Sequence, residues 1–133
     1  MAKNVKKVNR IPDAELAVMK VVWAQGKKEI GSAVVIEGLK DTHEWAMTTV
    51  LNFMARLVNR GFLGVRKTGK TNIYTVLIDE ATYLKHESKS FLENLHNNSF
   101  TSLVASLYDG KSISKNDLDE LTSFIKEKSG KGS

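Results

Sequence analysis

The chain contains no cysteine among its 133 residues, and it has only one proline and three histidines. The absence of cysteine excludes disulfide bonds, a thiol nucleophile, a thiol redox switch and thiolate metal sites. No apolar run approaches the ~20 residues that span a bilayer. The basic N-terminus lacks the apolar segment of a secretory signal. We therefore expect a cytoplasmic protein that has no transmembrane segment and does not bind membranes directly.

The motifs of common enzymes are also missing. The chain has no nucleophile elbow, phosphate-binding loop, dinucleotide fingerprint or zinc-protease helix motif. His86 and His96 lie ten residues apart, which is not the spacing of a metal-binding pair on one helix. We expect no metal site, no cofactor and no enzymatic activity. A small hydrolase built on His43 or His86 is an alternative that no motif supports.

Positive charge is concentrated in the first part of the chain. Residues 1–78 hold 13 lysines and arginines against 6 acidic residues, whereas residues 79–133 hold 7 against 9. A basic segment is the electrostatic pattern of a nucleic-acid binder. Taken alone the pattern is weak, because lysine-rich surfaces are common on soluble proteins.

Periodicity and turn residues predict a mainly α chain in which an N-terminal winged helix is followed by a three-helix dimerisation segment. The expected parts are a flexible basic arm (1–10), a winged-helix domain (11–78), a helical dimerisation domain (79–128) and a disordered tail (129–133). The winged helix should contain helices near 13–24, 32–40 and 46–60, and strands near 29–30, 63–67 and 72–77. The second part should contain helices near 80–97, 100–108 and 115–128.

The helix near 46–60 should have two different faces. Three- and four-residue spacing predicts a buried stripe made of Val50, Phe53, Met54 and Leu57. The opposite face carries Thr48, Thr49, Asn52, Arg56 and Asn59, and the candidates for base contact among them are Thr48, Thr49 and Asn52. Asparagine can bond adenine through two hydrogen bonds, and threonine methyls can contact thymine methyls in the major groove. We expect these three residues to contact bases, and a solvated helix face is the alternative.

Basic and indole side chains around this helix are candidates for phosphate contacts. They are Trp45, Arg56, Arg66, Lys67 and Lys70. The last three lie at the tip of the expected hairpin, where phosphate contacts would position the protein without reading sequence. Arg56 could instead form an intramolecular ion pair. Trp45 could pack beneath the helix and direct its indole N–H at a phosphate.

The C-terminal segment carries more apolar side chains than three short helices of about 50 residues can cover. The candidate dimer-interface residues are Leu84, Phe91, Leu95, Phe100, Leu103, Val104, Leu107, Leu118, Leu121 and Ile125. A second copy of the chain would cover them in a twofold dimer. Such a dimer would also place two recognition helices at half-sites about one DNA turn apart.

Several stretches of the sequence resemble one known family. They are Asp13–Trp23 (DAELAVMKVVW), Trp45, Thr49-Val50, Arg56-Leu57, Gly61–Leu63 and Ser102–Val104. Together they resemble the penicillinase repressor (BlaI/MecI/CopY) family of bacterial winged-helix repressors, closest to its BlaI/MecI branch, over about residues 11–128. The resemblance implies a homodimer that binds double-stranded operator DNA, a palindrome of TACA/TGTA half-sites, and represses β-lactam-resistance genes. It also implies a membrane zinc-metalloprotease antibiotic sensor as a partner, and cleavage of the repressor in its dimerisation helices.

The chain departs from the resistance members of that family at some positions. Ala46–Thr49 stand where those members carry Ser-Pro-Lys-Thr, and Leu51 stands where they carry arginine. The bond between Ser106 and Leu107 is the candidate cleavage site, where they carry Asn-Phe. The absence of cysteine excludes the thiolate copper sensing of the copper-responsive branch. A winged-helix module for protein assembly, without specific DNA binding, is the alternative function.

Overall fold

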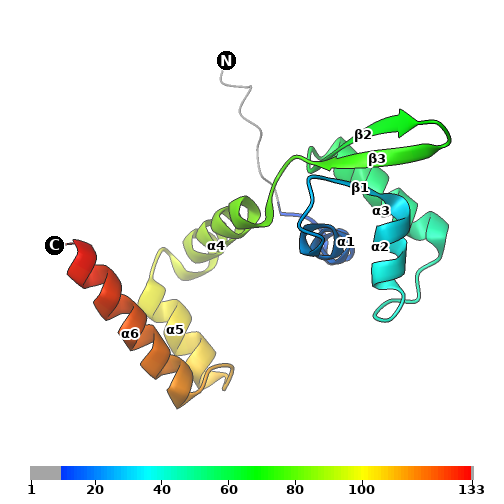
Figure 1. The fold of residues 1–133 in the computed structure, drawn as a ribbon. Helices are drawn as coiled ribbons and strands as arrows, with labels where there is room; N and C mark the ends of the chain where they lie inside the picture. Colours follow the sequence, from blue (N-terminus) through cyan, green and yellow to red (C-terminus); the bar gives the residue numbers. More distant parts are fainter. Residues whose placement is uncertain (1–9, 133) are drawn as a thin grey trace. The chain divides into compact units, whose positions relative to one another are not determined.

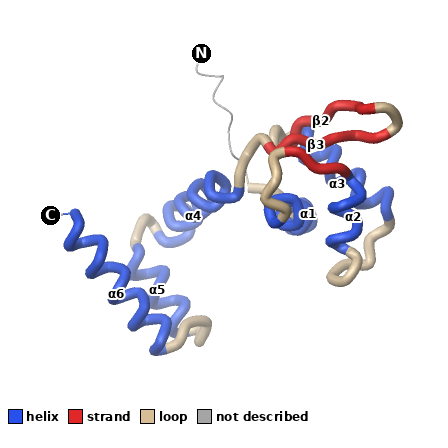
Figure 2. Tube along the Cα trace, viewed as in Figure 1, coloured by secondary structure: helices blue, strands red, loops and turns tan. Residues whose placement is uncertain are grey.

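The computed structural model of the protein describes residues 10–132. The expected basic arm, apart from Arg10, and Ser133 lie outside the described residues. Figure 1 follows the elements along the chain, and Figure 2 distinguishes the helices from the strands. In chain order the elements are α1 (Asp13–Ala24), β1 (Glu29–Gly31), α2 (Ser32–Leu39), α3 (Met47–Asn59), β2 (Leu63–Thr68), β3 (Thr71–Val76), α4 (Glu80–His96), α5 (Phe100–Asp109) and α6 (Lys115–Gly132).

The predicted fold class is confirmed: the chain is mainly helical, and a winged helix precedes three further helices. The chain forms two compact units, of which the first ends at Glu87 and the second begins at Ser88. Helix α6 continues to Gly132, whereas the sequence prediction placed a tail after residue 128. The lysine and glutamate residues at 126–128 have high helix propensity, which favours extension of the helix. Each glycine in the last turn lowers helix stability by only about 1 kcal/mol relative to alanine.

Three antiparallel strands form a small sheet with the order β1–β3–β2. Strands β2 and β3 make a hairpin that closes where Thr68 lies opposite Thr71. Gly69 in the turn has a φ of +64°, a left-handed conformation that glycine adopts without steric strain. Strand β1 pairs with the other edge of β3, with Ile30 opposite Tyr74. The β2–β3 hairpin is the wing, and Figure 2 shows the loop at its tip.

One apolar core joins α1, α2 and α3 to the sheet. Its buried side chains are Ile11, Val18, Met19, Val22, Ile30, Val35, Leu39, Val50, Met54, Leu57, Phe62, Leu63, Tyr74, Ile78 and Tyr83. The α3 members, Val50, Met54 and Leu57, have the spacing of an amphipathic helix. Phe53, which we also expected in this stripe, is half-buried at its edge. The stripe determines which face of α3 points outward.

A buried carboxylate connects α1 to the end of α3. Glu15 is 1% exposed, and it is the one buried charged residue in the part of the chain that the structure describes. Arg60, the C-cap residue of α3, donates from Nε to Oε1 of Glu15 at 2.6 Å and from a terminal nitrogen to Oε2 at 3.5 Å. A carboxylate that has left water requires such hydrogen-bonding partners. The ion pair therefore holds α1 and α3 together at a defined point.

The beginning of α4 belongs to the first unit. The Asp79 side chain accepts a hydrogen bond from the backbone N–H of Thr82 at 2.8 Å, as an N-cap does. Hydrogen bonds from the Thr82 side chain and backbone hold the pKa of Asp79 below its usual value. One turn further on, Tyr83 is buried, and its hydroxyl accepts a hydrogen bond from the Ile11 N–H at 3.1 Å.

Loss of Arg60 would leave the Glu15 carboxylate buried without its cation. We expect Arg60→Ala to lower the free energy of unfolding by about 2 kcal/mol, because the buried Glu15 carboxylate would lose its hydrogen bonds. Urea unfolding followed by tryptophan fluorescence measures the change. Arg56→Ala, on the exposed face of the same helix, is the control and should change it by less than about 0.5 kcal/mol. Equal effects of the two substitutions would contradict the structural role of the pair.

Candidate nucleic-acid interface

Helix α3 presents a polar face opposite its buried stripe. Thr48 and Asn52 are exposed and Thr49 is half-buried. At 100° per residue these three side chains lie on one face of the helix. None of the three has a side-chain hydrogen-bond partner within residues 10–132, and Ala46 at the N-cap provides no side-chain cap. Their hydroxyl and amide groups are therefore available to a ligand. Their contact with bases stays a prediction.

Arg56 lies on this polar face, and Trp45 lies just before the helix. Arg56 is exposed, its guanidinium carbon is 5.8 Å from the centroid of the Phe53 ring, and it forms no ion pair with a described residue. Trp45 is half-buried between the His43 ring, at 4.1 Å, and the Phe53 ring, at 5.0 Å. Its indole N–H has no partner among the described residues. Both groups can thus donate to a phosphate.

The positive charges of the wing are not equivalent. Arg66 lies 3.2 Å from a carboxylate oxygen of Glu29 and donates a hydrogen bond to the Thr68 hydroxyl at 2.8 Å. Glu29 therefore neutralises part of the Arg66 charge. Lys67 and Lys70 are exposed and have no ion-pair partner in the described part of the chain. Of the three predicted wing contacts, the two lysines carry the more available charge.

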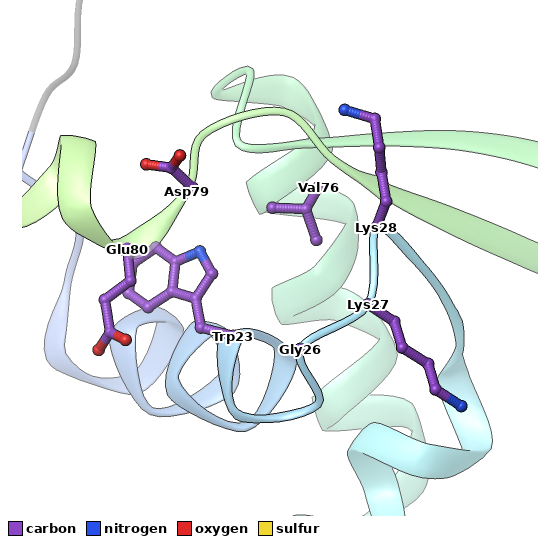
Figure 3. A pocket seen from close by; sticks show the side chains of 7 residues that line it. All are labelled: Trp23, Gly26, Lys27, Lys28, Val76, Asp79 and Glu80. Carbon is purple, nitrogen blue, oxygen red and sulfur yellow. The ribbon is translucent and has the colours of Figure 1, made fainter.

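The cavity beside Trp23 in the first unit shows no catalytic arrangement. This cavity of about 310 Å³ is lined by Trp23, Gly26, Lys27, Lys28, Val76, Asp79 and Glu80 (Figure 3). Trp23 donates its indole N–H to the Ile78 carbonyl at 3.0 Å, so its ring is a structural part of the wall. The lysine and carboxylate groups are spread around the rim in Figure 3. Within residues 10–132, no cluster of histidine and acidic residues could hold a metal ion, and no helix combines the length and apolar character needed to cross a bilayer.

The second unit leaves its apolar side chains in contact with solvent. Of the candidate dimer residues, the exposed ones are Leu84, Phe91, Leu95, Phe100, Leu107 and Ile125, and the half-buried ones are Leu103, Val104, Leu118 and Leu121. Tyr108 and Phe124, which our candidate set omits, are also exposed. Leu84 is the one candidate that falls in the first unit. No described side chain of the second unit is buried.

The candidate cleavage bond lies near the C-terminal end of α5. Ser106 and Leu107 are both exposed. The Ser106 carbonyl accepts a hydrogen bond from the Gly110 N–H at 3.0 Å, and the Leu107 carbonyl accepts one from the Ser112 N–H at 2.8 Å. A protease that binds an extended peptide would first have to break these hydrogen bonds.

Comparison with known proteins identifies the family. The sequence model of the penicillinase repressor family matches residues 11–127. The chain belongs to the penicillinase repressor family. The penicillinase repressor of Bacillus licheniformis is 34% identical over 123 residues, which cover 92% of this chain and 94% of that protein. The methicillin resistance regulatory protein MecI of Staphylococcus aureus (strain N315) is 27% identical over 122 residues, which cover 92% of this chain and 98% of MecI.

A solved structure supports the same assignment. The solution structure of the DNA-binding domain of the repressor BlaI aligns with a TM-score of 0.50 and 39% sequence identity, and the alignment covers 59% of this chain and 94% of that domain. Members of the penicillinase repressor family are DNA-binding transcriptional repressors and not enzymes. The hydrolase alternative is therefore wrong.

The unequal charges of the wing should give Lys70→Ala and Arg66→Ala different effects on the salt dependence of DNA binding. We expect Lys70→Ala to reduce the slope of log affinity against log salt by about 0.9, the value for one lost phosphate contact, and to weaken binding to all duplexes alike. Arg66→Ala should reduce the slope by less, because Glu29 already neutralises part of that charge. Fluorescence anisotropy across a salt series measures both, with Lys126→Ala in the second unit as the control. A larger change for Arg66→Ala than for Lys70→Ala would contradict this reading of the wing.

Proposed function

We propose that this chain is a homodimeric cytoplasmic repressor that binds a palindromic TACA/TGTA-type operator and controls β-lactam-resistance genes. The observation that carries the proposal is the exposed polar face of α3, with unpartnered Thr48 and Asn52. Such a face fits the major groove, where amide and methyl groups distinguish base pairs. The similarity to the Bacillus penicillinase repressor and to MecI over most of the chain supports resistance genes as the targets.

Each part of the interface has its own role in this proposal. Thr48, Thr49 and Asn52 contact base edges. The phosphate contacts come from Trp45, Arg56, Lys67 and Lys70, with a weaker contribution from Arg66. The base contacts select the sequence, and the phosphate contacts set the orientation and the salt dependence.

The base contacts can be tested by fluorescence anisotropy on a ~30 bp TACA/TGTA palindrome and a scrambled duplex of the same length. We expect the palindrome to bind ~10³-fold more tightly than the scramble, or better. Asn52→Ala should weaken binding to the palindrome by ~1–3 kcal/mol and change binding to the scramble little. Asn94→Ala, an amide substitution in the second unit, is the matched control.

The other outcomes of this experiment are distinct. A steep salt slope without preference for the palindrome would contradict the operator and leave a non-specific DNA binder. Lack of binding to either duplex at low salt would favour the protein-assembly module instead. If the Asn52→Ala protein bound the palindrome as tightly as the wild type, Asn52 would not be a base-contacting residue.

The dimer is supported by the apolar side chains of the second unit. Phe91, Leu95 and Phe100 are 46%, 63% and 49% exposed in the single chain. Large apolar side chains left exposed in this number favour a surface that a protein partner covers. A twofold partner would bury the same set of residues on both chains. It would also supply the second recognition helix that a palindrome requires.

We expect the wild-type protein to sediment as a dimer and Leu107→Asp to weaken its association by ~10²-fold or more, because a carboxylate would be buried without a partner. Sedimentation velocity at several protein concentrations measures the association. Thr101→Asp, a polar position on the same helix, is the control. Trp23 and Trp45 both lie in the first unit, so unchanged tryptophan fluorescence shows that this unit stays folded. A monomeric wild-type protein at all concentrations contradicts the proposed dimer.

Release from DNA in this proposal follows from proteolysis of the second unit. A membrane zinc-metalloprotease antibiotic sensor would initiate cleavage, as the family resemblance implies, and the Ser106–Leu107 bond is the candidate site. The cut would separate most of α5 from α6 and so divide the apolar surface of the dimer. A monomer contacts one half-site only, so its affinity for the operator falls.

Mass spectrometry of the protein from its host after exposure to a β-lactam tests this step. We expect a fragment that ends at Ser106 and its C-terminal complement. The same host without antibiotic is the control. An intact chain at full derepression of the target genes would exclude cleavage as the signal, and a fragment that ends elsewhere would relocate the bond.

A further inference from the structure

Four side chains, two from the loop before α3 and two from the helix itself, contact one another in a row. The His43 and Trp45 rings are stacked, with centroids 4.1 Å apart at 27°. The Phe53 ring meets Trp45 edge-on at 5.0 Å and 68°. The guanidinium carbon of Arg56 lies 5.8 Å from the Phe53 centroid. We call these four residues the ring stack. It begins in the loop before α3 and continues along that helix.

The ring stack reaches the polar face of α3. Phe53 follows Asn52 directly and lies between the polar face and the buried stripe. His43 and Trp45 are half-buried and Arg56 is exposed. The row of contacts therefore connects the imidazole and the indole to the guanidinium on the polar face of α3.

The hydrogen bonds of His43 leave one ring nitrogen available. Nδ1 lies 2.9 Å from the Thr42 hydroxyl oxygen, and Nε2 has no partner among the described residues. When the hydroxyl donates to Nδ1, the neutral ring carries its proton on Nε2. When the ring is protonated, Thr42 accepts from Nδ1 and Nε2 still donates. The other neutral tautomer donates from Nδ1 to Thr42 and leaves Nε2 as an acceptor, so a contact in which Nε2 donates requires the Nε2–H tautomer or the protonated ring.

The charges around His43 leave its ring without an ion-pair partner. Lys40 and Glu44 line the cavity of about 350 Å³ beside it, and Asp41 lies two residues earlier in the same loop. Lys40 is paired with Glu37 of α2 at 3.1 Å. The α3 residues that line this cavity, Met47 and Val50, and the α2 residues Ile36 and Leu39 are apolar. No described carboxylate forms an ion pair with the imidazole.

We propose that His43 is a further DNA-contacting residue, whose Nε2–H donates to a phosphate of the strand that α3 approaches. This inference rests on the proposed function and adds one phosphate contact to it. Stacking on Trp45 fixes the ring, and an indole is the best aromatic partner for a protonated imidazole. Imidazole is the side chain that gains a positive charge between about pH 8 and pH 5. The three donors of the ring stack would then contact the DNA backbone.

The test is anisotropy on the same palindrome at about pH 8 and about pH 5.5, each across a salt series, for the wild type, His43→Gln, His43→Phe and His86→Gln. For the wild type we expect affinity to rise about fivefold on acidification, and the salt slope to steepen by about 0.9. His43→Gln keeps a donor but cannot be charged, so both changes should vanish. His43→Phe keeps the stacking on Trp45 and should show neither change. His86→Gln, at an exposed histidine of α4, should behave like the wild type.

Several results would overturn the inference. If the affinity of His43→Gln still rose on acidification, another titratable group would be responsible for the rise. A His43→Phe protein with wild-type binding at both pH values would make the ring a structural support of Trp45 only. If the affinity of the wild type for the palindrome did not rise on acidification, the proposed contact between His43 and a phosphate would be wrong, but the proposed function would stand. Lack of DNA binding at either pH would overturn both.

Discussion

The ion pair between Glu15 and Arg60 sets the position of α3, and the DNA-facing surface depends on that position. A helix that is held only by an apolar stripe can shift along its axis, because hydrophobic contacts are not directional. Two hydrogen bonds to one buried carboxylate fix the end of α3 against α1. The helix surface can then present a defined set of polar groups, as readout of base edges requires.

The second constraint is electrostatic. The wing holds three cationic side chains, but the carboxylate of Glu29 reaches across to Arg66 and leaves the lysines as the stronger phosphate ligands. On α3, Arg56 adds a further positive charge beside Asn52 and Thr49, with its guanidinium 5.8 Å from the Phe53 ring centroid. Positive charge is therefore available both at the wing and on the helix that carries the candidate base contacts. In DNA-binding domains, phosphate contacts typically orient the protein and base contacts select the sequence.

Local pattern was sufficient to predict much of this structure. The period of α3 predicts its buried stripe and its polar face, and the turn around Gly69 predicts the wing, because both depend on residues close in sequence. The pairings of Glu15 with Arg60 and of Glu29 with Arg66 join residues 45 and 37 positions apart, so no local pattern contains them. The sequence did contain one indication that Glu15 has a partner. Glu15 precedes Val18 and Met19 by three and four residues, which places it on the buried stripe of α1, where a carboxylate needs a partner.

An NMR titration of the ¹⁵N-labelled protein with the TACA/TGTA palindrome would show whether the polar face of α3 and the tip of the wing meet DNA. We expect the largest amide shifts at saturation in residues 43–56 and 66–71, and little change in α6. Saturable binding with the main shifts in α4–α6 and none in α3 would contradict this expectation.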